Sequence, residues 1–205
     1  MIEQLDGIIS KLDELKRLDA DFHIFGSKSH EYSRNITKTE DDLVQFEKQN
    51  SIKLPEEYRE FLKTVGNGGA GPKYGLEPIE NGKFGDLEYR NDNFLIELSK
   101  PFPHTEPWNL DFGEIEHDNE DEYFELKEEE YFNEKWSYGL LRISNYGCGI
   151  SANIVVNGKE HGNIWIDDRC NDMGIYPAKT EEDNNRLTFL NWYENWLDES
   201  IKECR

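Results

Sequence analysis

The stretch LPEEYREFLKTVGNGG, residues 54–69, combines a helix start, an apolar stripe and a glycine-rich end. Pro55 suits the first helical position, because its missing N–H would have no intrahelical partner there. Glu56 and Glu57 then lie near the positive end of the helix dipole. The glycines are expected to end the helix, since glycine adopts the left-handed cap conformation without a side-chain clash. The predicted buried stripe is Tyr58, Phe61, Leu62 and Val65.

Two further helices are predicted before this stretch. Apolar residues recur every three or four positions over residues 2–18, which is the spacing of an amphipathic helix. For the next helix, either Thr37 with Glu40 or Thr39 with Asp42 can form a capping box, and both caps stay open. Its inward-facing residues are Leu43 and Phe46.

A last helix is predicted near the C-terminal end of the sequence. Thr180 stands three residues before Asp183, which is the spacing of a capping box. A helical period of apolar and aromatic residues then follows. Its members are Leu187, Leu190, Tyr193, either Trp196 or Leu197, and Ile201.

Short strands are predicted between these helices. The stretches GLLRISNYG (139–147), GISANIVVNG (149–158) and GNIWIDD (162–168) are separated by glycine-bearing turns. Their close spacing favours consecutive antiparallel pairing. KYGLEPIE (73–80) and FLIELS (94–99) are further strand candidates. The order of elements predicts an α+β fold.

Composition narrows the possible partners. Apolar residues make up 36% and aromatic residues 13% of the 205 residues, which is typical of a folded domain with a very polar surface. The formal net charge is −21, so a nucleic-acid backbone and an anionic membrane surface would both be repelled. The charge instead favours a basic protein partner.

Cysteine usage and the first residues point to a reducing compartment. Cys148, Cys170 and Cys204 are widely spaced and odd in number, so neither a disulfide framework nor a zinc site is predicted. The sequence begins without a basic segment followed by an apolar run, and no stretch approaches membrane-spanning length. A cytoplasmic protein with reduced thiols is expected.

Four of these segments, in this order, resemble the SUKH superfamily, bacterial immunity proteins of the Smi/Knr type that are related to a fungal cell-wall-synthesis regulator. The segments are LPEEYREFLKTVGNGG, the following GLEPI, then LLRISNYGCGISANIVVNGKEHGNIWIDD, and the final TFLNWYENWLD. The resemblance covers roughly residues 36–80 and 138–198. It implies an α+β domain with a central, curved, largely antiparallel sheet flanked by helices.

The resemblance also implies an organisation and a role. We expect residues 1–205 to form a single SUKH-like domain, with an N-terminal helical extension at 1–35 and an expanded acidic connection at 81–137. Bacterial members typically bind and neutralise a cognate secreted toxin, commonly a nuclease. The matching residues are a helix start, glycine turns and core aromatics, so no catalytic residue is carried over.

The acidic connection contains the most unusual stretch, EIEHDNEDEYFELKEEEYF, residues 114–132. Residues 114–130 contain ten acidic residues and one basic residue, Lys127, so this stretch contributes −9 to the net charge. One interpretation is a solvated, self-repelling segment. Another is a surface that mimics a nucleic-acid backbone and enters the basic cleft of a nuclease. The predicted partner-binding residues are Glu116, Asp118, Glu120, Asp121, Glu122, Tyr123, Glu125, Glu128, Glu129 and Glu130.

Two further readings of this stretch stay open. Its aromatic residues, Tyr123, Phe124, Tyr131 and Phe132, are either anchors inside a charged rim or the inward face of a helix or strand. A calcium site is the third interpretation of the acids, but DNEDE lacks the alternation and the glycine of an EF-hand loop.

Catalytic patterns are weak throughout the chain. Cys148 and His161 could form a nucleophile–base pair if adjacent turns bring them together, although a cysteine in a strand is more often a small buried hydrophobe. Asp167, Asp168 and Glu160 are acids of a kind expected by chance in a chain with 44 of them. We therefore predict no enzyme, no cofactor and no metal.

The predicted function is that of an immunity protein. It would neutralise a basic toxin domain, such as a nuclease, by occluding its active or substrate-binding surface. The alternative is a general protein-interaction or regulatory module of the same fold without a toxin partner. The sequence leaves the oligomeric state open.

Overall fold

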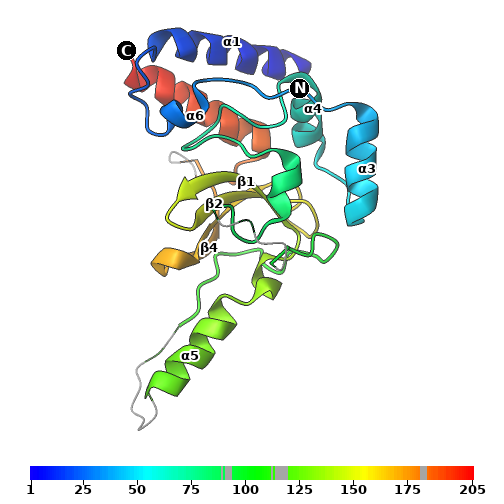
Figure 1. Cartoon of the computed structure of the whole chain (residues 1–205), viewed down its shortest axis with the longest axis vertical. Helices are drawn as coiled ribbons and strands as arrows, with labels where there is room; N and C mark the ends of the chain where they lie inside the picture. Colours follow the sequence, from blue (N-terminus) through cyan, green and yellow to red (C-terminus); the bar gives the residue numbers. More distant parts are fainter. Residues whose placement is uncertain (89, 91–93, 112, 114–119, 181–183) are drawn as a thin grey trace.

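A computed structural model of the chain confirms the α+β fold (Figure 1). For residues 120–122 it describes the backbone only. The described residues are 1–88, 90, 94–111, 113, 120–180 and 184–205. Their helices are α1 (Ile2–Leu18), α2 (Ser27–His30), α3 (Glu40–Asn50), α4 (Glu56–Thr64), α5 (Glu120–Tyr131) and α6 (Phe189–Glu203), with the 3₁₀ turns η1 (Ile79–Lys83), η2 (Glu134–Ser137) and η3 (Arg169–Asn171).

The end of α4 differs in detail from the prediction. Pro55 is the N-cap residue and lies one position before the first helical residue. The helix ends before the glycines, since Val65 at its C-cap keeps a right-handed conformation. Gly68 and Gly69 then take φ values of +88° and +104°. A Cβ on Gly68 would lie 2.8 Å from the Leu76 carbonyl oxygen, so the glycine allows two backbone segments to pack closely.

The sheet has four antiparallel strands in the order β1-β2-β3-β4. The three predicted strands are confirmed, and the fourth was not predicted. The candidates at 73–80 and 94–99 are wrong: Leu76 forms single bridges to Gly69 and Ser144, and Leu95 forms one to Phe84. The strands are β1 (Leu140–Gly147), β2 (Ile150–Val155), β3 (Ile164–Asp168) and β4 (Gly174–Pro177).

The last helix begins later than the sequence predicts. Its N-cap is Thr188, eight residues after the predicted cap at Thr180. The segment before it folds back on itself instead, because the Thr180 N–H donates to the Asn185 carbonyl at 2.9 Å and Lys179 pairs with Arg186. Asp183, the predicted capping partner, lies outside the described residues.

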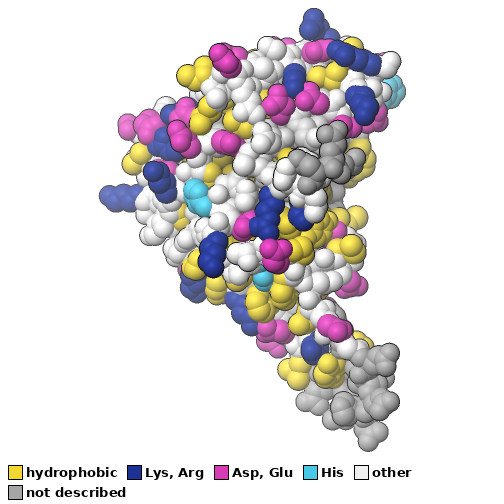
Figure 2. Space-filling model, turned by 180° about the vertical axis from the view of Figure 1, so that it is seen from behind, with side chains coloured by type: hydrophobic (Ala, Val, Ile, Leu, Met, Phe, Trp, Pro, Cys, Tyr) yellow, Lys and Arg dark blue, Asp and Glu magenta, His cyan; other side chains and the backbone are white. Residues whose placement is uncertain are grey.

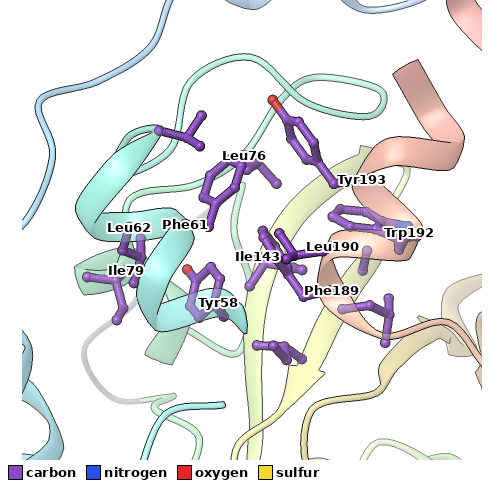
Figure 3. Close-up of a cluster of buried hydrophobic side chains, with 14 of the residues drawn as sticks. Tyr58, Phe61, Leu62, Leu76, Ile79, Ile143, Phe189, Leu190, Trp192 and Tyr193 are labelled. Carbon is purple, nitrogen blue, oxygen red and sulfur yellow. The ribbon is translucent and has the colours of Figure 1, made fainter. Parts of the chain in front are cut away.

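One face of the sheet carries the main core. In Figure 3, Ile143 of β1 points toward side chains of α4 and α6. Phe61 of α4 contacts Phe189 and Tyr193 of α6, with ring centroids 5.0 and 4.9 Å apart. The amphipathic α1 packs along α6 on the far side (Figure 1), where Lys11 forms an ion pair with Glu194 at 2.8 Å.

The other face of the sheet is covered by the long connection before β1. Trp165 of β3 is fully buried there, and its ring centroid lies 4.9 Å from that of Phe102. Trp108 and Trp136 stack at 4.6 Å and pack against the same cluster. The connection therefore supplies a second, smaller core in addition to its acidic segment.

Candidate functional site

Residues 120–131 of the acidic stretch form α5, which projects away from the body of the protein at the end opposite α1 (Figure 1). Figure 2, a view from behind, shows acidic, basic and hydrophobic side chains together on this narrow projection. The segment is therefore helical where it is described, and it is presented to solvent.

The predicted partner-binding residues divide into four groups. Glu116 and Asp118 lie outside the described residues, and the described backbone places positions 120–122 in the first turn of α5. Glu125, Glu128 and Glu129 are exposed, and within the described part of the chain none of them forms an ion pair. Tyr123 is half-buried. Glu130 is also half-buried and forms an ion pair with Lys135 at 2.6 Å.

The aromatic residues of this stretch play both of the roles that the sequence left open. Tyr131 is buried, with 1% exposure, and its ring stacks on Trp108 at 5.6 Å between centroids. Phe124 and Phe132 are exposed, as is Leu126 with 61% exposure. The helix thus exposes apolar side chains beside three carboxylates that have no ion-pair partner among the described residues, and exposed aromatic side chains on a projecting element favour a protein-binding surface.

The C-terminal end of α5 is fixed to the sheet by hydrogen bonds. The Trp136 indole N–H donates to the Glu130 carbonyl at 2.9 Å. Arg169, just after β3, donates from Nη1 to the Tyr131 carbonyl at 3.0 Å. Tyr131 in turn donates through its hydroxyl to Asn109 at 2.6 Å. The direction of the projecting helix is therefore set at its base.

Arg169 belongs to a buried charge cluster on the second face of the sheet. Its Nε and Nη2 donate to the Asp167 carboxylate at 2.8 and 2.7 Å, and Arg142 of β1 donates to the same carboxylate at 3.2 Å. Burial alone would raise the pKa of Asp167, but hydrogen bonds and positive charge from the two arginines outweigh it and lower this pKa to about 2. Burial lowers the pKa of Arg142, against the opposing charge of Asp167.

The cluster forms the floor of a cavity of about 160 Å³ at the base of α5. Phe132, at the end of α5, and Phe94 contribute apolar wall. The exposed Cys170 and the half-buried Asp86 also line it. A cavity with an apolar wall and a few convergent polar groups has the general form of a ligand site.

The structure separates the residues of the weak catalytic patterns. Cys148 lies in the turn before β2, whereas His161 lies in the loop after it, so the strand holds them at its opposite ends. The His161 ring bonds to the Lys53 carbonyl at 2.9 Å. Among the described residues, no group of three or more His, Cys, Asp or Glu side chains is arranged to hold a metal ion.

The cavity residues were missed in the sequence analysis, which treated Asp167 as a chance acid. A signal was present: Arg142 interrupts the apolar run LLRIS, and Asp167 follows the apolar WI of β3. Charged side chains within apolar strands are seldom buried unless they are paired. The pairing itself depends on the register, which sets Ser151 opposite Asp167 and Arg142 opposite Asn153.

No described helix has both the length and the apolar character needed to cross a bilayer.

Comparison with known proteins gives a match to a family model. No curated protein and no protein of solved structure matches the chain. Residues 38–199 match the model of the SMI1 / KNR4 family (SUKH-1). The match covers most of the chain, including the sheet, α3 to α5, most of α6 and the cavity. The chain belongs to the SMI1 / KNR4 family (SUKH-1).

Proposed function

We propose that this chain is an immunity protein that acts in the cytoplasm, binds a basic toxin domain through α5 and occludes its active or substrate-binding surface. A nuclease is the proposed toxin, because its substrate cleft must be basic to bind nucleic acid. The observation that carries the proposal is the exposure of Glu125, Glu128 and Glu129 around Phe124 and Leu126 on a projecting helix. Membership in the SUKH-1 family is consistent with this role.

Charge and apolar contacts have different parts in the proposed binding. The carboxylates of α5 attract a basic partner from a distance and raise the association rate, an effect that salt screens. Phe124 and Leu126 are removed from water in the complex and slow its dissociation. The interaction would therefore depend on salt mainly through its association rate.

The first experiment uses the full chain as bait in lysate of its own bacterium, at low and high salt. We expect one basic protein domain to be captured at low salt and retained at high salt. Its purified activity, such as nucleic-acid cleavage, should then be inhibited at an equimolar amount of the chain. Capture without inhibition would favour the alternative, a general protein-interaction module.

A triple variant tests the role of α5. Reversing the charges at Glu125, Glu128 and Glu129 to lysine should slow association with the captured partner by roughly tenfold or more at low salt. The matched control reverses three exposed acids of α1, at Glu3, Asp6 and Asp13, which lie at the far end of the molecule. Equal slowing by both triple variants would show that net charge alone sets the association rate and that α5 is not part of the interface.

The leading helix belongs to the proposal as well. The family match covers residues 38–199, so α1 precedes it, whereas it includes most of α6. Four buried residues of α1 face α6 and the main core. We propose that residues 1–205 form a single domain, with 1–35 as its extension and 81–137 as its expanded connection. The buried residues of α1 are Leu5, Ile8, Leu12 and Leu15.

A further inference from the structure

The cavity at the base of α5 has an unusual charge balance. Two guanidinium groups, from Arg142 and Arg169, share the single buried carboxylate of Asp167. These three side chains are all at least 94% buried, so little solvent compensates their net charge of +1. A second buried carboxylate, Asp168, is engaged elsewhere, since it accepts from Asn171 at 2.7 Å.

The two arginines differ in how many of their N–H donors have a hydrogen-bond acceptor. Arg169 donates to Asp167, to the Tyr131 carbonyl and to Ser137. Arg142 donates from its two terminal nitrogens, but its Nε is buried and has no hydrogen-bond partner in the part of the chain described. A buried donor without an acceptor is destabilising, and more so when the group is charged. An acceptor delivered into the cavity would relieve this cost.

We propose that this cavity binds a small carboxylate, whose oxygens pair with Arg142 while its hydrocarbon part lies against Phe94 and Phe132. Arginine is suited to this ligand because its planar guanidinium matches the geometry of a carboxylate. The size is adequate, since a cavity of about 150 Å³ holds a molecule as large as benzene. The test uses free carboxylates and no protein partner, so its failure is distinguishable from a failure of the proposed function.

Two acidic residues at the rim of the cavity provide a further test, because their charge opposes the binding of an anion. Asp86 and Glu88 also line the cavity, and an Asp86 oxygen accepts from the Glu88 N–H at 2.7 Å. They are less buried than the floor, so solvent and salt screen their charge more strongly. They still oppose an incoming anion. Removing one of these charges should tighten the binding of an anion, loosen that of a cation and leave a neutral ligand unaffected.

The experiment is an NMR titration of the full chain, labelled with ¹⁵N, with three probes of one shape: butyrate, butyramide and butylammonium. Butyrate should shift the backbone amides of Gly149, Ile150 and Cys170 saturably and bind at least tenfold more tightly than butyramide. Butylammonium should not bind. Equal binding of butyramide, tighter binding of butylammonium, or no saturable shift with any probe would overturn the proposal.

Surface variants locate the site without disturbing the buried cluster. Asp86→Asn should tighten butyrate binding severalfold, and Cys170→Phe should abolish it by filling the cavity mouth. Met173→Phe, an exposed position outside the cavity, is the matched control and should leave the affinity unchanged. Butyrate binding that survives Cys170→Phe would place the ligand elsewhere and overturn the assignment.

A fourth probe distinguishes the two sources of a carboxylate. N-acetyl-glutamate methylamide presents the carboxylate as a protein side chain does, whereas butyrate represents a free small acid. Tighter binding of the blocked glutamate would identify a protein side chain as the ligand. Binding of butyrate alone would identify a free acid.

Discussion

At the scale of single residues, Asp167 is the group on which the second face of the sheet depends. It neutralises one of two buried guanidinium groups and accepts three hydrogen bonds from them. Breaking a buried ion pair is strongly destabilising, because the partner charge is left uncompensated. For the same reason, the two arginines lower the pKa of Asp167 by more than burial raises it.

We predict that Asp167→Asn lowers the free energy of unfolding by about 3–5 kcal/mol at pH 7, because two buried arginines then lack a counter-charge. Urea denaturation followed by circular dichroism measures the change. Asp172→Asn is the control, since Asp172 is exposed and its left-handed conformation, with φ of 59°, is one that asparagine tolerates. A loss below about 1 kcal/mol for Asp167→Asn would show that the cluster is solvated or rearranged.

At the scale of elements, the start of α3 decides between two caps that the sequence left open. Thr39 accepts from the Asp42 N–H at 3.2 Å, and the Asp42 carboxylate accepts from the Thr39 N–H at 2.9 Å. These bonds form the reciprocal capping box. The other candidate, Thr37, is exposed and lies before the helix.

Thr39→Ala should therefore lower the free energy of unfolding by about 1 kcal/mol, because one helix N–H loses its acceptor. Thr37→Ala makes the same chemical change two residues earlier and should stay within about 0.5 kcal/mol of the wild type. Thermal and urea unfolding of both variants give the comparison. Equal losses would mean that alanine acts through the unfolded chain and not through the cap.

Periodicity predicted α1, which buries one regular stripe, because a repeating pattern records a local geometry. It did not predict β4, which has four residues, begins with glycine and ends with proline. That strand exists because Trp165 and Ile166 of β3 provide a partner edge, at Pro177 and Tyr176. The late start of α6 has the same cause: a non-local pairing takes up the residues before Thr188.

At the scale of the whole molecule, the sequence predicted the location of the charge but not the environment around it. The net charge and the cluster of acidic residues before residue 131 can both be read from the sequence alone. The cavity cannot, because Arg142 and Asp167 meet only through the register of three strands, and Phe132 reaches it from the turn just after α5. Contacts between distant segments depend on the complete fold, which no local pattern records.

Two buried histidines, His104 and His30, make the stability of the protein depend on pH. His104 packs against both Trp108 and Trp136. Burial together with the charge of Arg169 lowers its pKa to about 4, against weaker opposing effects of a hydrogen bond with the Trp136 backbone and of Asp167. His30 packs against Trp196 of α6, and burial lowers its pKa to about 4 despite the nearby charge of Asp19. Both side chains are therefore neutral in the folded protein at pH 7.

We predict that stability falls as the pH drops from 6.5 toward 4, because the unfolded chain, with histidine pKa near 6.5, binds protons that the folded protein excludes. Each histidine contributes at most about 1.4 kcal/mol per pH unit, and carboxyl groups with a lowered pKa, such as Asp167, add to the loss below about pH 5. Urea midpoints at pH 8 and pH 4.5 measure the loss. It should shrink in His104→Gln and in His30→Gln, and stay unchanged in His161→Gln, whose ring is exposed. A loss equal to that of the wild type in both buried variants would assign the acid sensitivity to the protonation of other groups.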